Sequence, residues 1–404
     1  MKKLLFSYQV IGYFSRLISQ FMQPRLSSRG MLLLSLLLLS ACQDQQAPKN
    51  SQGLPMKIEN QSHKLVIAHR GASGYLPEHS LAAKAMAHAM NADYIEQDVV
   101  MTKDDRLVVL HDPYLDRVTD VMEVFPTRFR IVQDQKRWLA IDFTLNEIKQ
   151  LNMSEGFSVD SKTQMKTADY PSRFPLFKSS FKVATLEEEI ELIQGLNFSR
   201  EKDIGVYVEI KAPWFHLNEG KDISRLTLKI LGNYGYRTQQ DKAFVQCFDP
   251  DETKRIKTKL MPELNLNLKL VQLIAETSWN ETMRMVDGQL VAYDYQWMFE
   301  PGAMAKIAEY ADAIGPWKPM IVSDKSTADH LIISDMVSAA HQNGLQVHPY
   351  TFRQEPSRIP AYAQDFEQLL DIFLFQVGVD GVFTDFPDRA VAYIDKKEKI
   401  VNKK

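Results

Sequence analysis

Short apolar runs recur along the chain from residue 64 onward, each about as long as a strand buried inside a domain. The predicted strands are Leu65–Ala68, Tyr94–Val100, Leu107–Leu110, Ile204–Ile210, Ala243–Cys247, Leu268–Leu273, Ala313–Gly315, Leu345–Tyr350 and Val379–Thr384. Amphipathic stretches with the period of an α-helix lie between many of them, namely Ser80–Ala89, Thr185–Leu192, Ile223–Leu231, Met304–Tyr310, Ile333–Gln342 and Phe366–Gln376. This alternation predicts a parallel sheet covered by helices.

The number of strands narrows the fold class. Residues 103–106, with the sequence KDDR, are typical of a turn, so the strands on either side are predicted to form a hairpin. If the second arm of that hairpin is discounted, eight strands remain, and eight parallel strands with helices make a TIM (β/α)8 barrel. Residues 113–182 interrupt the alternation and show one helical pattern, Leu145–Leu151. We therefore expect a barrel over residues 64–396 with a small inserted subdomain at about 113–182.

Composition and charge remove some function classes. The chain has 404 residues, of which 45% are apolar and 25% charged, so it can bury a sizeable core. Its formal net charge is −3, and without a basic excess we expect no nucleic-acid partner. The two cysteines are Cys42 and Cys247. The sequence gives no indication of the oligomeric state.

The first 41 residues have the features of an export signal. Arg25 and Arg29 precede a short leucine-rich run, which ends in Leu-Ser-Ala-Cys at Cys42. Leu-Ser-Ala before a cysteine resembles a bacterial lipoprotein cleavage site, so residues 1–41 are predicted to be removed and Cys42 to be lipidated. An ordinary cleaved signal is the alternative. The start of the chain is unlike a usual leader, so translation starts at Met1 or at Met22.

The segment after the predicted lipid is polar. Residues 42–63 contain Pro and Gly and few apolar side chains, which is typical of a flexible tether. Gln43 rather than aspartate follows Cys42, as in lipoproteins sent to the outer membrane. We therefore expect a protein anchored by lipid, in the outer membrane of a Gram-negative bacterium, facing the periplasm or the cell surface.

Three carboxylates are predicted to face the interior at the ends of strands. Glu96 and Asp98 are two residues apart and so lie on the same face of one strand, whereas Ile95 and Val99 face the other way. Glu209 belongs to a later strand. Carboxylates this close cannot all be ionised without a cation, and oxygen ligands suit Ca²⁺ or Mg²⁺. A solvated edge strand is the alternative interpretation.

Two histidines also follow predicted strands. His69 and His111 could act as general base and general acid, because imidazole titrates near neutral pH. Arg70 and Lys211 would supply positive charge for phosphate oxygens, and Gly71 would allow close backbone approach. Further polar residues near strand ends are Gln246, His348 and Asp385.

These motifs together carry a family resemblance. The segments HRGASGYLPEHS, EQDVVMTKDDRLVVLHD and EIKAPW resemble the glycerophosphodiester phosphodiesterases, and closely the bacterial periplasmic type. FVQCFDP, LKLVQLI, VHPYTFR and GVFTDFPD extend the resemblance over about residues 64–395. The lipidated form resembles surface lipoproteins of Gram-negative pathogens. Two positions depart from the family pattern: His79 stands where Asn is common, and Asp105 where Gly is common.

The resemblance implies a TIM barrel that hydrolyses glycerophosphodiesters to glycerol 3-phosphate and an alcohol. It also implies His69 and His111 as the catalytic histidines. The implied metal ligands are Glu96, Asp98 and Glu209, with Ca²⁺ the usual ion and Mg²⁺ or another divalent ion as alternatives, and the implied phosphate-binding cations are Arg70 and Lys211. Under this hypothesis one histidine deprotonates the glycerol 2-hydroxyl, the other protonates the leaving alcohol, and a cyclic phosphate is then opened by water.

Specificity is expected on the glycerol side of the substrate. An aromatic pocket would pack the glycerol carbons while the alcohol side stays open, and its candidate residues are Trp214, Phe248, Tyr350 and Phe386. The expected substrates are the choline, ethanolamine, glycerol and inositol diesters. Core packing is the alternative role for these aromatic side chains.

Two other functions remain open. A related barrel enzyme that cleaves phospholipids or lysophospholipids would also use two histidines and a membrane location, although no apolar loop suited to acyl chains is visible in the sequence. A surface-binding lipoprotein without catalysis is the other alternative. Loss of a carboxylate or histidine would favour it, yet all five residues are present.

Overall fold

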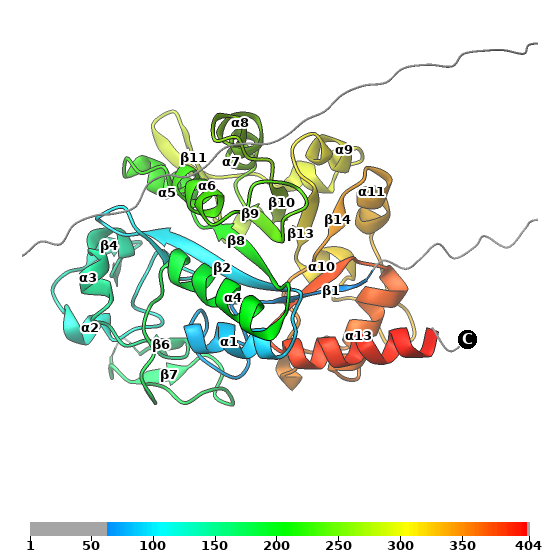
Figure 1. Ribbon diagram of the computed structural model, residues 1–404, viewed down its shortest axis with the longest axis horizontal. Coiled ribbons are helices and arrows are strands. Elements are labelled where there is room, and N and C mark those ends of the chain that lie inside the picture. Colours follow the sequence, from blue (N-terminus) through cyan, green and yellow to red (C-terminus); the bar gives the residue numbers. More distant parts are fainter. Residues whose placement is uncertain (1–62, 161, 402–404) are drawn as a thin grey trace, which may run out of the picture. The chain divides into compact units, whose positions relative to one another are not determined.

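Eight parallel strands form the body of the domain. The computed structural model describes residues 63–160 and 162–401. The strands follow one another in the order β14-β13-β10-β9-β8-β2-β1-β15, and Figure 1 shows helices around them. Their bounds are β1 Leu65–Ala68, β2 Tyr94–Met101, β8 Gly205–Ile210, β9 Ala243–Cys247, β10 Lys269–Ile274, β13 Ala313–Pro316, β14 Gln346–Val347 and β15 Gly381–Thr384.

Hydrogen bonds between the segments that contain β14 and β15, the first and last strands of this order, nearly close the barrel. The Asp380 N–H donates to the Val347 carbonyl at 3.0 Å, and the Phe383 N–H donates to the Pro349 carbonyl at 3.1 Å. The predicted TIM barrel is confirmed. Aromatic side chains fill its interior, with Tyr207 stacked on Phe244 at a centroid distance of 4.7 Å.

The predicted hairpin after β2 is also present. β3 (Leu107–Val109) pairs antiparallel with β2, and the Thr102 N–H donates to the Arg106 carbonyl at 2.9 Å to close the turn. Asp105, where the family commonly has glycine, takes a positive φ of 58°. Aspartate tolerates this left-handed conformation better than most residues, so the turn forms without glycine.

Helices follow most of the strands. Ser80 caps the first helix, since its side chain accepts a hydrogen bond from the Ala83 N–H. Helices near the predicted positions are α1 Leu81–Ala89, α4 Leu186–Arg200, α6 Ile223–Asn233, α9 Ala303–Ala308, α11 Met336–Gln342 and α12 Phe366–Asp371, which continues as a π-helical segment over Ile372–Val377. The helices of the described residues that were not predicted are α2 Val121–Val124, α5 Pro213–Asn218, α7 Pro250–Arg255, α8 Met261–Glu263, α10 Lys318–Ile321 and α13 Pro387–Val401.

Helix α4 is longer than its apolar pattern. A capping box joins Thr185 and Glu188 at its first turn, but beyond Ile193 its side chains are not buried in the core, and Phe198 is 89% exposed. The predicted end at Leu192 is therefore wrong, because the pattern marks only the part of the helix that packs on the barrel. The helix ends where Glu201 adopts a left-handed conformation.

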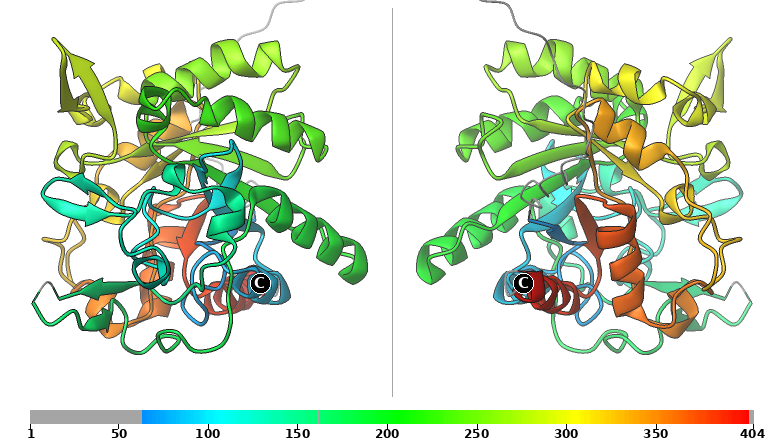
Figure 2. Two further views of the ribbon diagram at one scale, coloured as in Figure 1. Left: turned by 90° about the vertical axis from the view of Figure 1, so that its left-hand side faces the viewer. Right: turned by 90° about the vertical axis from the view of Figure 1, so that its right-hand side faces the viewer.

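The segment between β3 and α4 contains small elements only. These are α2 Val121–Val124, the hairpin of β4 Arg130–Val132 and β5 Gln135–Arg137, α3 Leu145–Ile148, and the hairpin of β6 Phe157–Val159 and β7 Lys166–Ala168. Trp138, Phe143 and Leu151 form a separate apolar cluster with Val100 and Val108 of the barrel strands. Figure 1 shows these elements gathered beside β2 and α1, and the left view of Figure 2 turns this side of the molecule toward the reader. We call this segment, residues 113–182, the insertion.

A second hairpin was not predicted. β11 (Met283–Val286) and β12 (Gln289–Ala292) pair antiparallel after β10 and stand out from the barrel in Figure 1. Asp287 and Gly288 both have positive φ at the turn, and Asp-Gly is a sequence signal for such a hairpin. Among the helices of the described ranges, none is long and apolar enough to cross a bilayer. Cys42, the predicted signal (1–41) and the tether (42–63) lie outside the described residues, apart from His63.

Candidate active site

Three buried carboxylates meet at one end of the barrel. Asp98 of β2 is opposite Glu209 of β8 in the parallel register, and Glu96 is two residues before Asp98. Each side chain offers an oxygen atom within 4.8 Å of the other two, and all three residues are at most 5% exposed. The structure therefore brings together the three carboxylates that the sequence singled out.

The electrostatics of this cluster favour a bound cation. Burial, followed by repulsion from Asp98, raises the pKa of Glu96 well above its usual value, and burial raises the pKa of Glu209 to about 8. Burial would also raise the pKa of Asp98, but His79, Lys211 and His111 together outweigh burial and lower that pKa. The Oδ1 atom of Asp98 is buried and has no hydrogen-bond partner within the described part of the chain. An all-oxygen cluster with an unsatisfied atom fits a hard divalent cation.

Neighbouring donors fix the orientation of these carboxylates. The Arg70 N–H donates to Oε2 of Glu96 at 2.8 Å, and the Gln246 side-chain amide donates to Oε1 at 2.9 Å. Lys211 donates to Oε1 of Glu209 at 2.7 Å. Gln246 was noted in the sequence only as a residue near a strand end, because its partner lies 150 residues away in the chain.

His79 has a definite structural role at the position where the family commonly has asparagine. Its Nε2 lies 2.8 Å from Oδ2 of Asp98, and Lys84 approaches its Nδ1 at 3.1 Å. Burial and Lys84 lower the pKa of His79 to about 3. A neutral imidazole that accepts from Lys84 must carry its hydrogen on Nε2, so it donates to Asp98. Lys84 is itself fully buried and pairs with Glu189 at 2.9 Å.

His69 is held by an aspartate from the last strand. Its Nδ1 lies 2.6 Å from Oδ1 of Asp385, and the two residues follow the paired ends of β1 and β15. Asp385 is anchored by Arg173 at 2.6 Å and Arg353 at 2.7 Å. The carboxylate accepts from Nδ1–H, so Nε2 of a neutral His69 is an acceptor. It lies 3.9 Å from Oε2 of Glu96.

The surroundings of His69 keep it uncharged. Burial and the charge of Arg70 lower its pKa to about 4, although Asp385 opposes this change. His111 follows β3 and is more exposed, with 28% of its side chain accessible. Its Nδ1 lies 2.7 Å from Oδ1 of Asp112. The other oxygen of that carboxylate, Oδ2, accepts a hydrogen bond from Arg117 at 3.2 Å. In both histidines an aspartate carboxylate therefore holds Nδ1, but the His111 side chain is more exposed than that of His69.

Arg70 follows His69 in an unusual backbone conformation. Its φ is 57° and that of Gly71 is 89°, and a Cβ atom on Gly71 would lie 2.9 Å from the backbone of Ala83. Glycine is therefore required by the packing of α1 against this turn. The Arg70 side chain donates to Glu78 at 2.6 Å, and its Nε lies 3.7 Å from Oδ2 of Asp98.

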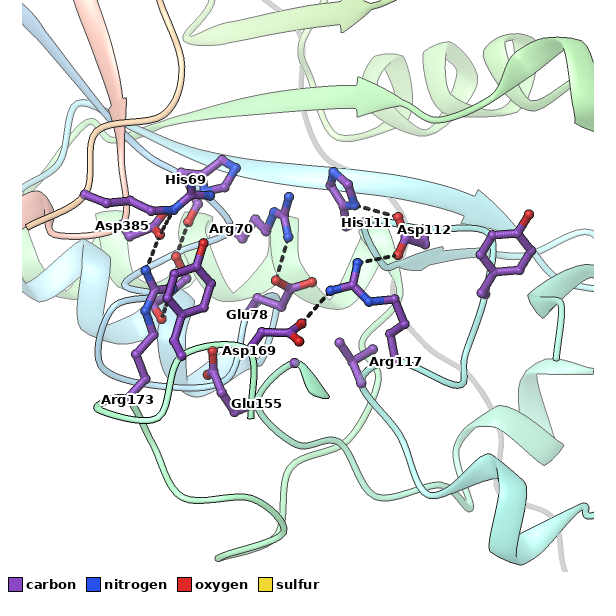
Figure 3. Close-up of a pocket in the computed structure, with 16 residues that line it drawn as sticks. His69, Arg70, Glu78, His111, Asp112, Arg117, Glu155, Asp169, Arg173 and Asp385 are labelled. Atoms are coloured by element: carbon purple, nitrogen blue, oxygen red, sulfur yellow. Dashed lines mark hydrogen bonds and ion pairs between the residues drawn. The ribbon is translucent and has the colours of Figure 1, made fainter. Parts of the chain in front are cut away.

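Two cavities meet at the histidines. The carboxylate cavity, of about 210 Å³, contains Glu96, Asp98 and Glu209. The insertion cavity, of about 180 Å³, is lined by residues of the insertion together with Glu78 and Asp385, and Figure 3 shows its side chains. Both cavities are lined by His69, Arg70, His111 and Arg353.

The four predicted aromatic residues separate into two groups. Phe248 and Tyr350 line the carboxylate cavity. Trp214 and Phe386 are not among its lining residues: the Trp214 indole donates to the Glu281 carbonyl at 3.1 Å, and Phe386 packs edge-on against Tyr75 in the core. His348 is also remote from the cavities, because it is buried within the barrel with its Nδ1 3.0 Å from the Tyr207 hydroxyl.

Several residues of the site were not predicted. Arg173, Arg353, Glu78 and Glu155 line the insertion cavity. Glu78 lies within HRGASGYLPEHS and Arg353 within VHPYTFR, but no role was predicted for either residue, and Arg173 and Glu155 lie in no quoted motif. Their positions depend on how the insertion and the last loops fold over the barrel. Asp385 carried a weak signal, since it follows a predicted strand within GVFTDFPD.

The class defined by this geometry is a barrel hydrolase with two histidines beside a metal-binding carboxylate cluster, and comparison with known proteins gives the family. The glycerophosphoryl diester phosphodiesterase family model matches residues 69–389. A glycerophosphodiester phosphodiesterase of Haemophilus influenzae is 46% identical over 92% of this chain and 99% of its own length. One from Treponema pallidum is 43% identical over 83% of this chain and 93% of its own.

Solved structures agree at the level of the fold. An Oleispira antarctica phosphodiesterase, in complex with the product sn-glycerol-3-phosphate, has a TM-score of 0.52 at 20% identity, covering 82% of this chain and 97% of its own. A protein described as a putative glycerophosphoryl diester phosphodiesterase from Silicibacter pomeroyi has a TM-score of 0.56 at 22% identity. The match covers 83% of this chain and 95% of that protein's chain. The chain belongs to the glycerophosphoryl diester phosphodiesterase family. It is an enzyme with glycerophosphodiester phosphodiesterase activity.

Proposed function

We propose that this enzyme converts glycerophosphodiesters to sn-glycerol 3-phosphate and an alcohol by acid–base catalysis between His69 and His111. The observation that carries the proposal is that both histidines line the cavity of the three buried carboxylates. The names of the relatives and the product bound in the Oleispira antarctica structure support the same substrate class.

Glu96, Asp98 and Glu209 would hold the divalent cation, for which we propose Ca²⁺, with Mg²⁺ as the alternative. When bound, such a cation polarises phosphate oxygens and lowers the pKa of a nearby hydroxyl group. Lys211 and Arg70 stand beside the same carboxylates. They supply positive charge where the phosphate would lie.

His69 is the better candidate for the base. Its neutral ring directs Nε2 toward the carboxylate cavity, where it can take the proton of the glycerol 2-hydroxyl. The hydroxyl oxygen then bonds to phosphorus, the bond from phosphorus to the leaving alcohol breaks, and His111 gives that alcohol its proton. Water opens the resulting cyclic phosphate with the two roles reversed.

Replacement of either histidine tests the assignment. We expect His69→Ala and His111→Ala each to lower kcat by about 10²–10⁴-fold, the usual contribution of a general acid or base. Release of glycerol 3-phosphate from glycerophosphocholine is the measurement. His341→Ala is the matched control, because His341 lies on α11 with Asp380 as its partner. Near-normal turnover in both test variants would contradict the assignment of these histidines as the acid–base pair.

On the glycerol side, Phe248 and Tyr350 would pack the carbon atoms. We propose that the choline, ethanolamine, glycerol and inositol diesters are all hydrolysed. A kinetic comparison in which one of the four is used and the others are refused would contradict this.

A second candidate function is the cleavage of phospholipids or lysophospholipids, and the hairpin of β11 and β12 supports it. Its apolar side chains Met285, Val286, Leu290 and Val291 are 59%, 48%, 46% and 40% exposed. It begins just after Glu281, which lines the carboxylate cavity. Such an apolar loop was not expected from the sequence. Cleavage of lysophospholipid micelles would support this function, and cleavage of soluble diesters alone would exclude it.

For its location, we propose a lipid anchor at Cys42 and the outer membrane of a Gram-negative bacterium. The support is the Leu-Ser-Ala-Cys motif and the polar segment 42–63. Incorporation of labelled palmitate that disappears in Cys42→Ser would support the anchor. Labelling that persists in that variant would contradict it.

A further inference from the structure

The insertion cavity contains one carboxylate without a partner. Glu155 is 4% exposed, and its Oε2 atom has no hydrogen-bond partner. Among the described residues it forms no ion pair, whereas every arginine that lines the cavity is paired with another carboxylate: Arg70 with Glu78, Arg117 with Asp112 and Asp169, and Arg173 and Arg353 with Asp385. Glu155 is therefore the acidic side chain of this cavity that has no positively charged partner in an ion pair within the described chain.

The backbone around Glu155 is held firmly. The Ser154 N–H donates to the Val118 carbonyl at 2.9 Å, and the Phe157 N–H donates to the Arg117 carbonyl at 3.0 Å. The segment thus forms part of the wall, and Figure 3 shows Glu155 across the cavity from His69 and Arg70. Burial and repulsion from Glu78 raise the pKa of Glu155 to about 8, although Arg173 opposes this change. The side chain is therefore mostly protonated at pH 7, and a cation beside it would favour its ionised form.

The position of the cavity indicates its occupant. His69, His111, Arg70 and Arg353 line both cavities, so a phosphate group at this boundary has one ester arm on each side. The glycerol arm belongs with the carboxylates, as the proposed function requires. The alcohol arm then lies in the insertion cavity, which is walled and not open as the sequence led us to expect.

We propose that the insertion cavity receives the leaving alcohol and that Glu155 is a specificity-determining residue that favours alcohols carrying a positively charged nitrogen. This inference rests on the proposed function. A cation beside Glu155 restores the missing ion pair, whereas a neutral alcohol leaves a buried carboxyl group without a charged partner. The preference is modest, so neutral diesters remain substrates.

A matched pair of substrates tests this directly. Glycerophosphoethanolamine and its ethylene glycol analogue differ only in an ammonium group and a hydroxyl group at the end of the alcohol. We expect kcat/KM to favour the ammonium substrate by about tenfold, the usual effect of one charged hydrogen bond. In Glu155→Gln that ratio should fall close to one, chiefly through KM for the ammonium substrate. Glu123→Gln, an exposed position in the same insertion paired with Lys166, should keep the wild-type ratio.

A measurement on the unaltered enzyme covers the case in which Glu155→Gln does not fold. Ethanolamine should then inhibit hydrolysis at about tenfold lower concentration than ethylene glycol, for the same reason. Equal inhibition, or a substrate ratio that Glu155→Gln does not change, would overturn the inference while the hydrolase remains. Absence of glycerol 3-phosphate from both substrates with the wild-type enzyme would overturn the proposed function and this inference with it.

Discussion

At the scale of single residues, most charged groups of the site have an oppositely charged partner, and Glu155 is an exception. Glu78 is an example of a paired group, since Arg70 donates to it at 2.6 Å. Burial would raise the pKa of Glu78, but Arg70, His79 and His111 together outweigh burial and lower that pKa to about 2, from an ordinary value of 4.5. The ionised form of Glu78 is therefore favoured in the folded state.

This shift predicts a pH-dependent stability difference for Glu78→Gln. A carboxyl group whose pKa is lowered by folding stabilises the fold above about pH 4.5, and that contribution is lost as the pH falls toward 2. We expect the variant to lose about 1–3 kcal/mol of unfolding free energy at pH 7, because Arg70 loses a partner. Urea unfolding across pH would show the two proteins converging near pH 2. A difference that stays constant down to pH 2 would contradict the shift.

The residues nearest the chemistry were the most predictable ones. His69 and His111 follow apolar strands, and Glu96, Asp98 and Glu209 lie within such strands on the inward face, so strand periodicity pointed to these positions in a barrel. Their supporting residues were not predictable in the same way. Arg173 reaches Asp385 across 212 positions of sequence, and no local pattern encodes a contact that forms only when the insertion folds back.

At the scale of elements, α1 and α4 support the carboxylate cluster through a buried ion pair that contacts the backbone of β2. Lys84 of α1 pairs with Glu189 of α4 and also donates to the Glu96 carbonyl. Both side chains are fully buried. Removing one partner of such a pair leaves an uncompensated buried charge, which lowers the free energy of unfolding. Replacing both partners with apolar groups leaves no buried charge and avoids this loss.

A double substitution tests this role. Lys84→Met should lower the unfolding free energy by about 3–5 kcal/mol, and Lys84→Met with Glu189→Leu should recover most of it. The double variant should still bind the cation about tenfold more weakly, because His79 loses the donor that directs it toward Asp98. Calorimetric titration and urea unfolding measure the two effects. A double variant as unstable as the single one would refute the pairing argument.

The elements that sequence periodicity missed have physical explanations. Helix α4 outlasts its apolar pattern because its second half projects into solvent, as the 89% exposure of Phe198 indicates. The hairpin of β11 and β12 packs little of its surface, so alternation of apolar and polar residues is weak there. Its Asp287-Gly288 turn was the available signal.

At the scale of the whole molecule, the cation is expected to be part of the stability of the barrel. The carboxylate cluster joins β2 and β8, and two of its three members have raised pKa values without a cation. Ligand bound only by the folded state stabilises it, by about 2.7 kcal/mol at a concentration one hundred times Kd. Removal of the cation should therefore weaken the fold.

Thermal unfolding with and without a chelator measures this linkage. We expect EGTA to lower Tm by several degrees and Ca²⁺ to restore it, since each kcal/mol corresponds to about 2–4 °C in domains of comparable size. Asp98→Asn should abolish the response, whereas Asp395→Asn, on the exposed face of α13, should keep it. An identical Tm in EGTA and in Ca²⁺ would argue against resident Ca²⁺, and a Tm that EDTA also leaves unchanged would argue against any resident divalent cation.

The central claim is that the histidine pair and the carboxylate cluster form one metal-assisted site for glycerophosphodiesters. The most direct test is release of sn-glycerol 3-phosphate from glycerophosphocholine by the purified enzyme, first in EGTA and then with Ca²⁺ or Mg²⁺ added back. We predict that activity is lost in EGTA and restored by a divalent cation, Ca²⁺ above all. Release that continues unchanged in EGTA would contradict the choice of Ca²⁺, and release that also continues in EDTA would contradict the claim that the three carboxylates act through a bound cation.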